Sequence, residues 1–499
     1  MPRWAMGGGV AHNNSAATLI NATIVGNYAE GNGGGVRNNS GTVAYTNTLI
    51  WGNDSQANDP QVTDLGSPMV SYAHTLVQDF DLTGVGTGNL DGTDPLVNPL
   101  FANPISATSA PTTTGDYRLL PGSVAIDTGD NSATSIDIDL VDLPRRFNTI
   151  TDLGAYEAQG FNIESGGGSG QSAFFDDPFP DPLFVTVTAL LAGQPVTGGR
   201  VSFIGPNTGP SSAPPTTLAT IGSDGQATAS LKAGNLAGTY VVRARARGIT
   251  SGGIPSFFLT NDPIADVLGF TRTAPDPTKA VTVTWAITFS QSLSGLSLSD
   301  FQLLGTGTAT ATLASLSGSD TQYTLTASDV TGDGTLQAVL ITDLDASLPI
   351  RGLPVASEAY TIDNTPPSVT IAAPLPGTTS TNPVTFPISI TDNVTNALTI
   401  TLTVADVTLI GTGTATGTVS VLNGTSSSPE VLVSDINGGG SLQIRIAAGV
   451  ATDAAGNVSV ATNDSDSATV FTPTPTNTGT PTNTGPRRTR RRLIPRPRT

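Results

Sequence analysis

Leu296-Ser-Leu-Ser-Asp-Phe-Gln-Leu-Leu-Gly-Thr-Gly-Thr-Ala-Thr310 returns, at an offset of 106, as Leu402-Thr-Val-Ala-Asp-Val-Thr-Leu-Ile-Gly-Thr-Gly-Thr-Ala-Thr416. The same offset places Gly334-Thr-Leu-Gln-Ala-Val-Leu340 on Gly440-Ser-Leu-Gln-Ile-Arg-Ile446. Short runs of Thr, Val and Leu with Gly between them are typical of β-strands. Because about 100 residues is the size of one β-sandwich, the repeat indicates tandem sandwich domains and not the turns of a solenoid.

Alternating apolar residues predict further sandwich strands around this repeat. Trp285-Ala-Ile-Thr-Phe289 and Phe386-Pro-Ile-Ser-Ile390 stand near the start of the two units, and we expect Trp285 to pack in a core and not against a sugar. Phe184-Val-Thr-Val-Thr188 begins an earlier set of strands. In that set, the run Gly238–Arg247 places three arginines on one face, which either binds an acidic ligand or is simply a solvated face.

A second, shorter repeat occupies the N-terminal region. Gly7-Gly-Gly-Val10 recurs, at an offset of 26, as Gly33-Gly-Gly-Val36, and each copy leads through an Asn-rich turn to a short apolar strand. A period of this length predicts stacked turns, because one turn cannot bury its own apolar face. Gly and Asn suit the corners of such turns, where the backbone adopts positive φ.

Composition excludes several classes of protein. The 499 residues include no Cys and two His, and the formal net charge is −18. Residues 487–499 hold seven Arg and no acid, so the rest of the chain carries −25, which argues against nucleic acid as a partner. The Arg-rich end is either a basic binding tail or a shifted reading frame of Thr-Pro codons. No run of apolar residues is long enough for a transmembrane helix.

The quoted motifs resemble four families of bacterial surface domains. The Gly-Gly-Gly-Val repeats resemble the parallel β-helix of the polymorphic outer-membrane type, and Asp152-Leu-Gly-Ala-Tyr-Glu157 resembles the closing segment of the choice-of-anchor Q family. Asp142-Leu-Pro-Arg-Arg146 departs from that family, which has Gly after the Asp. Ala237-Gly-Thr-Tyr240 and its neighbours resemble invasin/intimin-type domains, and the two units of the longer repeat resemble the Ig-like repeats of biofilm-associated adhesins.

We therefore expect an all-β chain, in which a truncated right-handed parallel β-helix precedes three Ig-like β-sandwiches and a disordered tail. The expected parts are a β-helix fragment (1–160), a Gly/Ser/Pro linker (161–182), an invasin-type domain (183–261), two further Ig-like domains (262–363 and 364–471) and a Thr/Pro-rich and Arg-rich tail (472–499).

The only site residues that we predict are ligands for Ca²⁺. In the adhesin arrays that the last two domains resemble, Asp and Asn at domain junctions often hold this ion, and oxygen ligands in an acidic chain suit a hard cation. The residues that match are Asp262, Asp363, Asn364 and Asp392. The alternative is that these are ordinary turn residues.

The resemblance implies a non-catalytic adhesin-like protein of the bacterial surface or exterior, with its signal peptide and anchor missing from this chain. Its expected partners are glycans or surface proteins, and we expect a monomeric rod. The alternative is a polysaccharide-binding or polysaccharide-degrading β-helix, for which paired carboxylates are the feature to seek. The pairs in question are Asp79 with Asp81, or Asp137 and Asp139 with Asp142, on one face of a strand.

Overall fold

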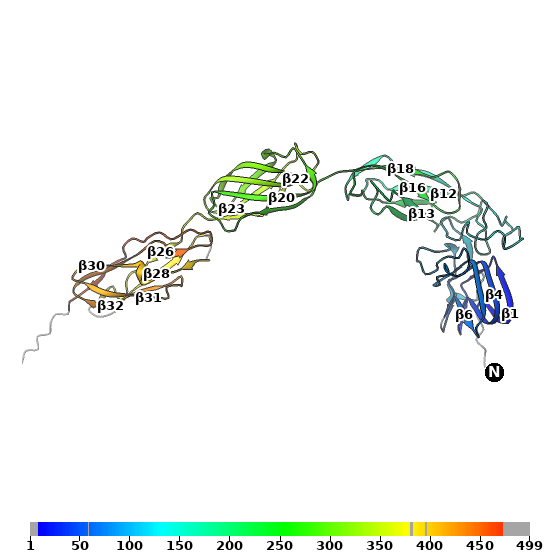
Figure 1. Cartoon of the computed structure of the whole chain (residues 1–499), viewed down its shortest axis with the longest axis horizontal. Helices are drawn as coiled ribbons and strands as arrows, with labels where there is room; N and C mark the ends of the chain where they lie inside the picture. Colours follow the sequence, from blue (N-terminus) through cyan, green and yellow to red (C-terminus); the bar gives the residue numbers. More distant parts are fainter. Residues whose placement is uncertain (1–7, 58, 380–382, 395–396, 473–499) are drawn as a thin grey trace, which may run out of the picture. The chain divides into compact units, whose positions relative to one another are not determined.

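The computed structural model describes residues 8–472 apart from 58, 380–382 and 395–396. In these ranges the regular elements are strands and three short 3₁₀ turns, so the all-β prediction is confirmed. The chain divides into two compact units, residues 1–264 and 265–499 (Figure 1). The part of the chain that is described contains no helix long and apolar enough to cross a membrane. The predicted tail, from residue 473 onward, lies outside the described residues.

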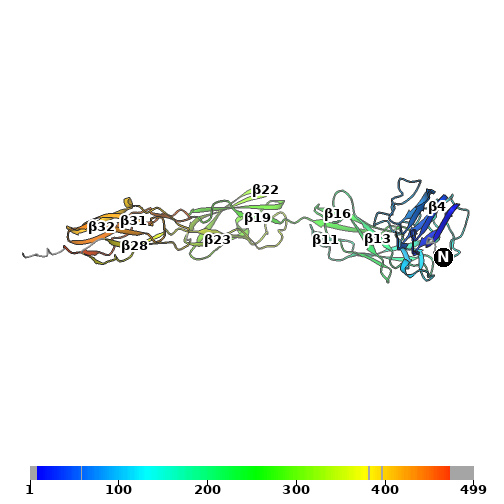
Figure 2. The same ribbon diagram turned by 90° about the horizontal axis from the view of Figure 1, so that it is seen from below.

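The N-terminal sequence repeat corresponds to the register of a parallel sheet. The strands β1 (Val10–Ile20), β4 (Val36–Trp51) and β7 (Met69–Val77) lie side by side, together with β2 (Thr23–Val25) and β6 (Val62–Leu65). Val10 pairs with Val36, and Val36 pairs with Val62, so the pairing advances by one sequence repeat at each step (Figures 1 and 2). We call these five strands the N-terminal stack.

Asparagines at equivalent positions of successive layers hydrogen-bond to one another. The Nδ2 atom of Asn47 donates to Oδ1 of Asn21 at 2.9 Å, and Nδ2 of Asn27 donates to Oδ1 of Asn53 at 3.0 Å. Glycine is required at Gly35, because a Cβ there would lie 2.6 Å from the carbonyl oxygen of Gln61 in the next layer. The repeat is therefore enforced by close backbone stacking.

The segment predicted as a flexible linker, residues 161–182, is instead part of a sandwich. Its strands β10 (Phe161–Gly167) and β11 (Gln171–Phe174) pair with β12 and β18. The glycines that suggested flexibility serve packing, because a Cβ on Gly166 would lie 2.0 Å from the ring of Phe184. A sequence read as a connector thus forms an interior strand of one sheet and an edge strand of the other.

The first sandwich has a four-stranded and a five-stranded sheet. Their orders are β15-β12-β10-β17 and β11-β18-β16-β13-β14. The strands not yet given are β12 (Leu183–Ala189), β13 (Arg200–Ile204), β14 (Thr216–Thr220), β15 (Gln226–Ala229), β16 (Gly238–Arg245), β17 (Ile249–Ser251) and β18 (Ser256–Asp262). One hydrophobic cluster runs from Leu49 and Leu76 of the N-terminal stack, through Phe161, to Val185 and Phe257 of the sandwich.

The second unit contains two further pairs of sheets with separate cores, 265–362 and 384–470. The first pair holds β19 (Val267–Arg272), β20 (Thr282–Leu293) and β22 (Thr310–Thr331) against β21 (Phe301–Gly305), β23 (Gly334–Leu340), β24 (Val355–Ala356) and β25 (Tyr360–Ile362). The second holds β26 (Ser368–Ile371), β28 (Val384–Thr391), β31 (Thr416–Leu422) and β32 (Glu430–Asn437) against β27 (Thr378–Thr379), β30 (Val407–Gly413), β33 (Gly440–Ile446) and β35 (Ala468–Val470).

The longer repeat holds at the level of single contacts. The strand β21 is related to β30, and β23 to β33, by the offset seen in the sequence, and each pair joins in the same antiparallel register. The hydroxyl contact between Thr306 and Thr335, at 2.7 Å, recurs between Thr412 and Ser441. Trp285 is fully buried against Tyr360, as predicted for a core residue.

We predict that Phe161→Ala destabilises the whole first unit, because the side chain lies in the cluster shared by stack and sandwich. Removal of a buried Phe side chain costs about 3–5 kcal/mol. The measurement is urea unfolding of the full chain with Trp285→Phe, which leaves Trp51 to report on the described part of the first unit.

Phe258→Ala is the matched control, because Phe258 is 56% exposed on an outer sheet face and its loss changes stability by about 0.5 kcal/mol or less. An unchanged midpoint for Phe161→Ala would contradict the shared core.

Candidate metal centre

Three carboxylates from separate segments of the second unit converge. Asp363 follows β25, Asp392 follows β28, and Asp453 follows the short strand β34 (Ala451–Thr452). Each offers an oxygen, and the three oxygens lie within 4.8 Å of one another. We call these three residues the carboxylate cluster. Since Asp363 ends the first of the two tandem sandwiches and the others belong to the second, the cluster lies at their junction.

The turn after β34 fixes two members of the cluster. The backbone N–H and the Nδ2 atom of Asn457 donate to the two carboxylate oxygens of Asp453, at 2.8 and 2.9 Å. The same Nδ2 donates to the backbone oxygen of Asp363 at 2.7 Å. Lys279, from the first tandem sandwich, donates to the backbone oxygen of Gly456 in this turn. One turn therefore ties the second tandem sandwich of this unit to the end of the first tandem sandwich.

Asp363 is fully buried, and its Oδ2 atom has no hydrogen-bond partner. Its Oδ1 atom accepts only a long bond of 3.3 Å from the N–H of Thr365. Burial raises the pKa of this carboxyl to about 6, and the nearby charges of Asp392, Asp453 and Asp333 add to the rise. A buried carboxylate without a donor is destabilising unless a cation or a proton compensates it.

The geometry matches the needs of a hard divalent cation. Ca²⁺ takes six to eight oxygen ligands from carboxylates, carbonyls and water, in a flexible arrangement. The three carboxylates supply the negative charge and up to six oxygens, although those that already accept hydrogen bonds are less available. The donors are all oxygen, since the chain has no Cys and neither His belongs to the cluster.

A second network beside the cluster involves Asp333. Its Oδ1 accepts from the N–H of Asn364 at 2.7 Å, and its Oδ2 accepts from Nδ2 of Asn393 at 2.9 Å and from the hydroxyl of Thr365. Burial raises the pKa of Asp333, but these hydrogen bonds outweigh it and leave the pKa below its ordinary value. Asp333 is therefore already satisfied, in contrast to Asp363.

The structure brings together two of the four predicted ligands. Asp363 and Asp392 lie in the carboxylate cluster. Asn364 is turned to the other network, where its Nδ2 donates to the carbonyl of Gly332 at 2.7 Å. Asp262 ends β18 in the first unit and belongs to no such group in the described residues, so its assignment is not supported. Asp453 was missed, although its turn, Asp453-Ala-Ala-Gly-Asn457, was visible in the sequence.

The predicted group Asp137, Asp139 and Asp142 does not lie on one face of a strand, because no strand covers this segment of the described chain. Ile136–Leu140 forms only one isolated bridge, and the predicted alternation is absent, because the whole segment is exposed except for Asp139, which is buried. Asp139 accepts from the N–H groups of Leu143 and Glu157, both at 3.0 Å. The carboxylate therefore fixes the closing loop.

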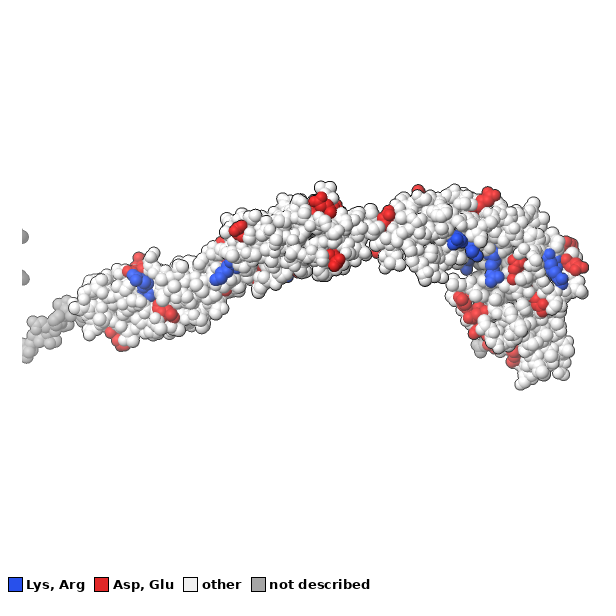
Figure 3. Space-filling model, turned by 45° about the horizontal axis from the view of Figure 1, so that its top comes forward, with Lys and Arg blue, Asp and Glu red and all other residues white. Residues whose placement is uncertain are grey.

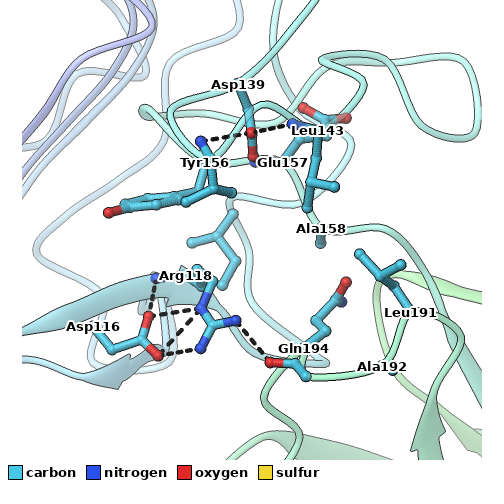
Figure 4. A pocket seen from close by; sticks show the side chains of 13 residues that line it. Asp116, Arg118, Asp139, Leu143, Tyr156, Glu157, Ala158, Leu191, Ala192 and Gln194 are labelled. Carbon is cyan, nitrogen blue, oxygen red and sulfur yellow. Dashed lines mark hydrogen bonds and ion pairs between the residues drawn. The ribbon is translucent and has the colours of Figure 1, made fainter.

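Asp139 lies at the edge of a cavity of about 510 Å³, and Figure 4 shows its walls. Arg118 on β9 (Asp116–Leu119) is held by Asp116 and donates to the carbonyl of Gly193 at 2.7 Å. Gln194, from the first sandwich, faces them. Arg118 is thus already engaged on both sides.

Behind this cavity lies a buried polar network around Arg145. Burial raises the pKa of Asp152 and of Glu157. Repulsion from Asp127 adds to the rise of the pKa at Asp152, and repulsion from Asp152 adds to the rise at Glu157. The oxygens of Asp152 accept from the N–H groups of Asp127 and Ala158, and those of Glu157 from Phe147 and Asp152. These carboxyls anchor the backbone, and Glu157 also lines the cavity.

Comparison with known proteins adds little to the geometry. No family model and no curated protein matches the chain. Among solved structures, FdeC, an Escherichia coli adhesin, is 16% identical over 61% of this chain and 96% of its own, with a TM-score of 0.23. The D0–D1 domain of intimin is 17% identical over 40% of this chain and 96% of its own, with a TM-score of 0.15. The Yersinia pseudotuberculosis adhesin InvE is 13% identical over 40% of this chain and 58% of its own, with a TM-score of 0.17. TM-scores at this level do not demonstrate a common arrangement.

We predict that about 2 mM Ca²⁺, near the range that extracellular modules bind, raises the melting temperature of the second unit. A gain of 1 kcal/mol shifts the melting temperature by about 4–8 °C for one sandwich of about 100 residues and by about 2–4 °C for a unit of about 200 residues. Asp363→Asn should abolish the shift, which differential scanning calorimetry measures. Asp435→Asn, at an exposed position of β32, is the control and should keep it.

Without the cation, the raised pKa of Asp363 has a defined effect on stability. The folded state holds a proton that the unfolded state has lost between about pH 4 and pH 6, so the free energy of unfolding falls as pH rises through that window. Urea titrations in chelator at pH 4.5 and pH 7 measure the difference. The decrease should vanish in Asp363→Asn; an equal decrease in that variant would assign it to other groups.

Proposed function

We propose that the protein is a non-catalytic, adhesin-like structural protein that presents its N-terminal stack on tandem β-sandwich spacers. The observation that carries this proposal is the junction of the second unit. There two sandwiches with separate cores are joined by hydrogen bonds from Asn457 and Lys279, beside the buried carboxylate of Asp363. Such a junction transmits load between domains.

The N-terminal stack is best explained as turns of a right-handed parallel β-helix of the choice-of-anchor Q type. The parallel register that follows the sequence repeat, the asparagine contacts between layers and the closing segment support this assignment. The three pairs of sheets are best explained as three Ig-like domains. The first of them begins at residue 161, because β10 belongs to it.

Ca²⁺ is the proposed structural ion of the junction, with Asp363, Asp392 and Asp453 as its protein ligands. When bound, the ion supplies the positive charge that the Oδ2 atom of Asp363 lacks. It also gives the two sandwiches a common ligand and so restricts their hinge motion. Extracellular Ca²⁺ concentrations suit modules of this kind, which agrees with the proposed location on the bacterial surface or outside the cell.

The alternative function, a polysaccharide-degrading β-helix, is favoured less. Such enzymes use two carboxylates on opposite sides of the bond that is cleaved. In the N-terminal region the buried carboxyls accept hydrogen bonds from backbone N–H groups, and the pair Asp79 and Asp81 lies near a bridge at Asp91. The proposed partners are glycans or surface proteins, which a non-catalytic face binds and leaves intact.

The proposal predicts that the protein holds beads on a coated surface without degrading the polysaccharide. Beads that carry the full chain should adhere to surfaces coated with bacterial or host polysaccharides, or with surface proteins, and detach more readily under shear in chelator than in Ca²⁺. Beads with Asp363→Asn should behave in Ca²⁺ as the unmodified chain does in chelator. The measurement is the number of beads retained against flow, with reducing ends assayed in the same chambers.

Asp435→Asn beads serve as the control for the loss of one acidic group. Release of reducing ends from any acidic polysaccharide would contradict the non-catalytic proposal and favour the alternative. Retention that is the same in Ca²⁺ and in chelator would remove the ion from the account.

A further inference from the structure

The first sandwich differs in charge from the rest of the chain. Residues 183–261 contain one acidic residue, Asp224, and five basic residues, although the chain as a whole carries −18. When basic residues gather in one region of an otherwise acidic chain, that asymmetry indicates an anionic partner. The five basic residues are Arg200, Lys232, Arg243, Arg245 and Arg247.

Four of these five lie together on the outer face of the five-stranded sheet. In the pairing of β13 with β16, Ile204 is opposite Arg243 and Ser202 is opposite Arg245. Arg200 and Arg247 continue the two strands on the same side, while Phe203 and Ala244 point to the core. Cross-strand neighbours stand about 5 Å apart, so the guanidinium groups share one patch. Figure 3 shows blue side chains next to one another in the first unit.

Three of these arginines lack the acidic partners that the chain gives to others. Arg118, Arg272, Arg351 and Arg445 each form an ion pair with a carboxylate. In the described ranges, no ion pair and no side-chain hydrogen bond involves Arg200, Arg243 or Arg245. Arg247 differs, because it donates to the carbonyl of Ile126 at 3.3 Å and its charge acts on the neighbouring Asp127. The patch therefore keeps the guanidinium donors of the other three for a ligand.

The patch borders a groove of about 690 Å³. One wall is the chain around Gly122, which is fixed between the two strands: Arg200 N–H donates to Pro121 O at 2.8 Å, and Gly122 N–H donates to Arg247 O at 3.0 Å. Gly122 permits this approach, because a Cβ there would lie 2.2 Å from the carbonyl oxygen of Arg200. The sheet face and this wall form a preformed groove.

We propose that this groove binds an acidic polysaccharide that carries carboxylate or sulfate groups. Guanidinium groups match such oxyanions with paired donors. Asn98, Ser202 and Thr216 add neutral polar groups suited to sugar hydroxyls, and Leu218, 46% exposed, gives an apolar surface for a sugar ring. The described lining includes no aromatic side chain, which disfavours single-stranded nucleic acid, because such ligands are held by base stacking.

The inference rests on the proposed function in that it names the ligand class of an adhesive protein. The groove belongs to the first unit and the carboxylate cluster to the second, so each is tested by its own variants. Loss of the groove's binding would leave the spacer role intact.

The experiment measures binding of the full chain to heparin and to polygalacturonate by biolayer interferometry. Because the seven arginines of 487–499 would also bind polyanions, they are changed to Gln in every protein used. The variant Arg200→Gln/Arg245→Gln, which removes two guanidinium groups of the groove lining, should then bind at least tenfold more weakly. By analogy with counterion release from other polyanions, its plot of log affinity against log salt should be less steep by about 2. The preferred polymer distinguishes sulfate from carboxylate recognition.

Lys232→Gln/Arg445→Gln is the control, because it removes two positive charges outside the groove lining. It should bind within about twofold of the parent, and both variants should keep the parent's melting temperature. Three results would overturn the proposal: no binding of either polysaccharide by the parent, an equal loss in the control, or tighter binding of oligothymidylate or polyglutamate.

Discussion

The second unit depends on one electrostatic constraint, the buried carboxylate of Asp363. It lies beside two further carboxylates, and its Oδ2 atom receives no hydrogen bond. Desolvation alone makes that arrangement costly, so a proton or a cation must share the site. The contacts around it, from Asn457 and Lys279, hold the two sandwiches in the position that maintains the cluster. The junction is thus stable only when its charge is compensated.

The first unit is organised by packing, and its polar groups serve the backbone. The parallel strands of the stack approach closely where Gly35 faces the next layer, and asparagine amides join the layers. At the end of the stack, Asp139, Asp152 and Glu157 accept hydrogen bonds from N–H groups that would otherwise be unpaired. Such groups are costly to leave buried without partners. This explains how the acidic groups of a loop-rich segment can be buried.

Much of the fold could be predicted from the sequence, because both repeats are periodic. The offset of the short repeat and that of the long repeat are register relations that fix which strands correspond. The segment 161–182 could not be assigned correctly, since Gly166 serves the ring of Phe184 and only the folded chain reveals that contact. The alternation at Ile136–Leu140 also misled, because hydrogen bonds to Asp139 outweighed the burial of the neighbouring apolar side chains.

The candidate site could be predicted in part. Asp363 and Asp392 were predicted from the resemblance to adhesin arrays, in which Asp and Asn stand at domain junctions, whereas Asp453 comes from a turn much further along the chain. The convergence of the three segments is a tertiary feature that spacing along the chain does not encode. The same is true of the groove beside the arginine patch. The row of arginines is visible in the sequence, but the wall of the groove comes from the distant segment around Gly122.

Equilibrium dialysis of the full chain against radioactive Ca²⁺, at pH 7 and with Asp363→Asn beside the unmodified protein, tests the account most directly. The account predicts that the unmodified chain binds one more ion than the variant does, and that Asp435→Asn binds as much as the unmodified chain. Equal binding by all three proteins would contradict it.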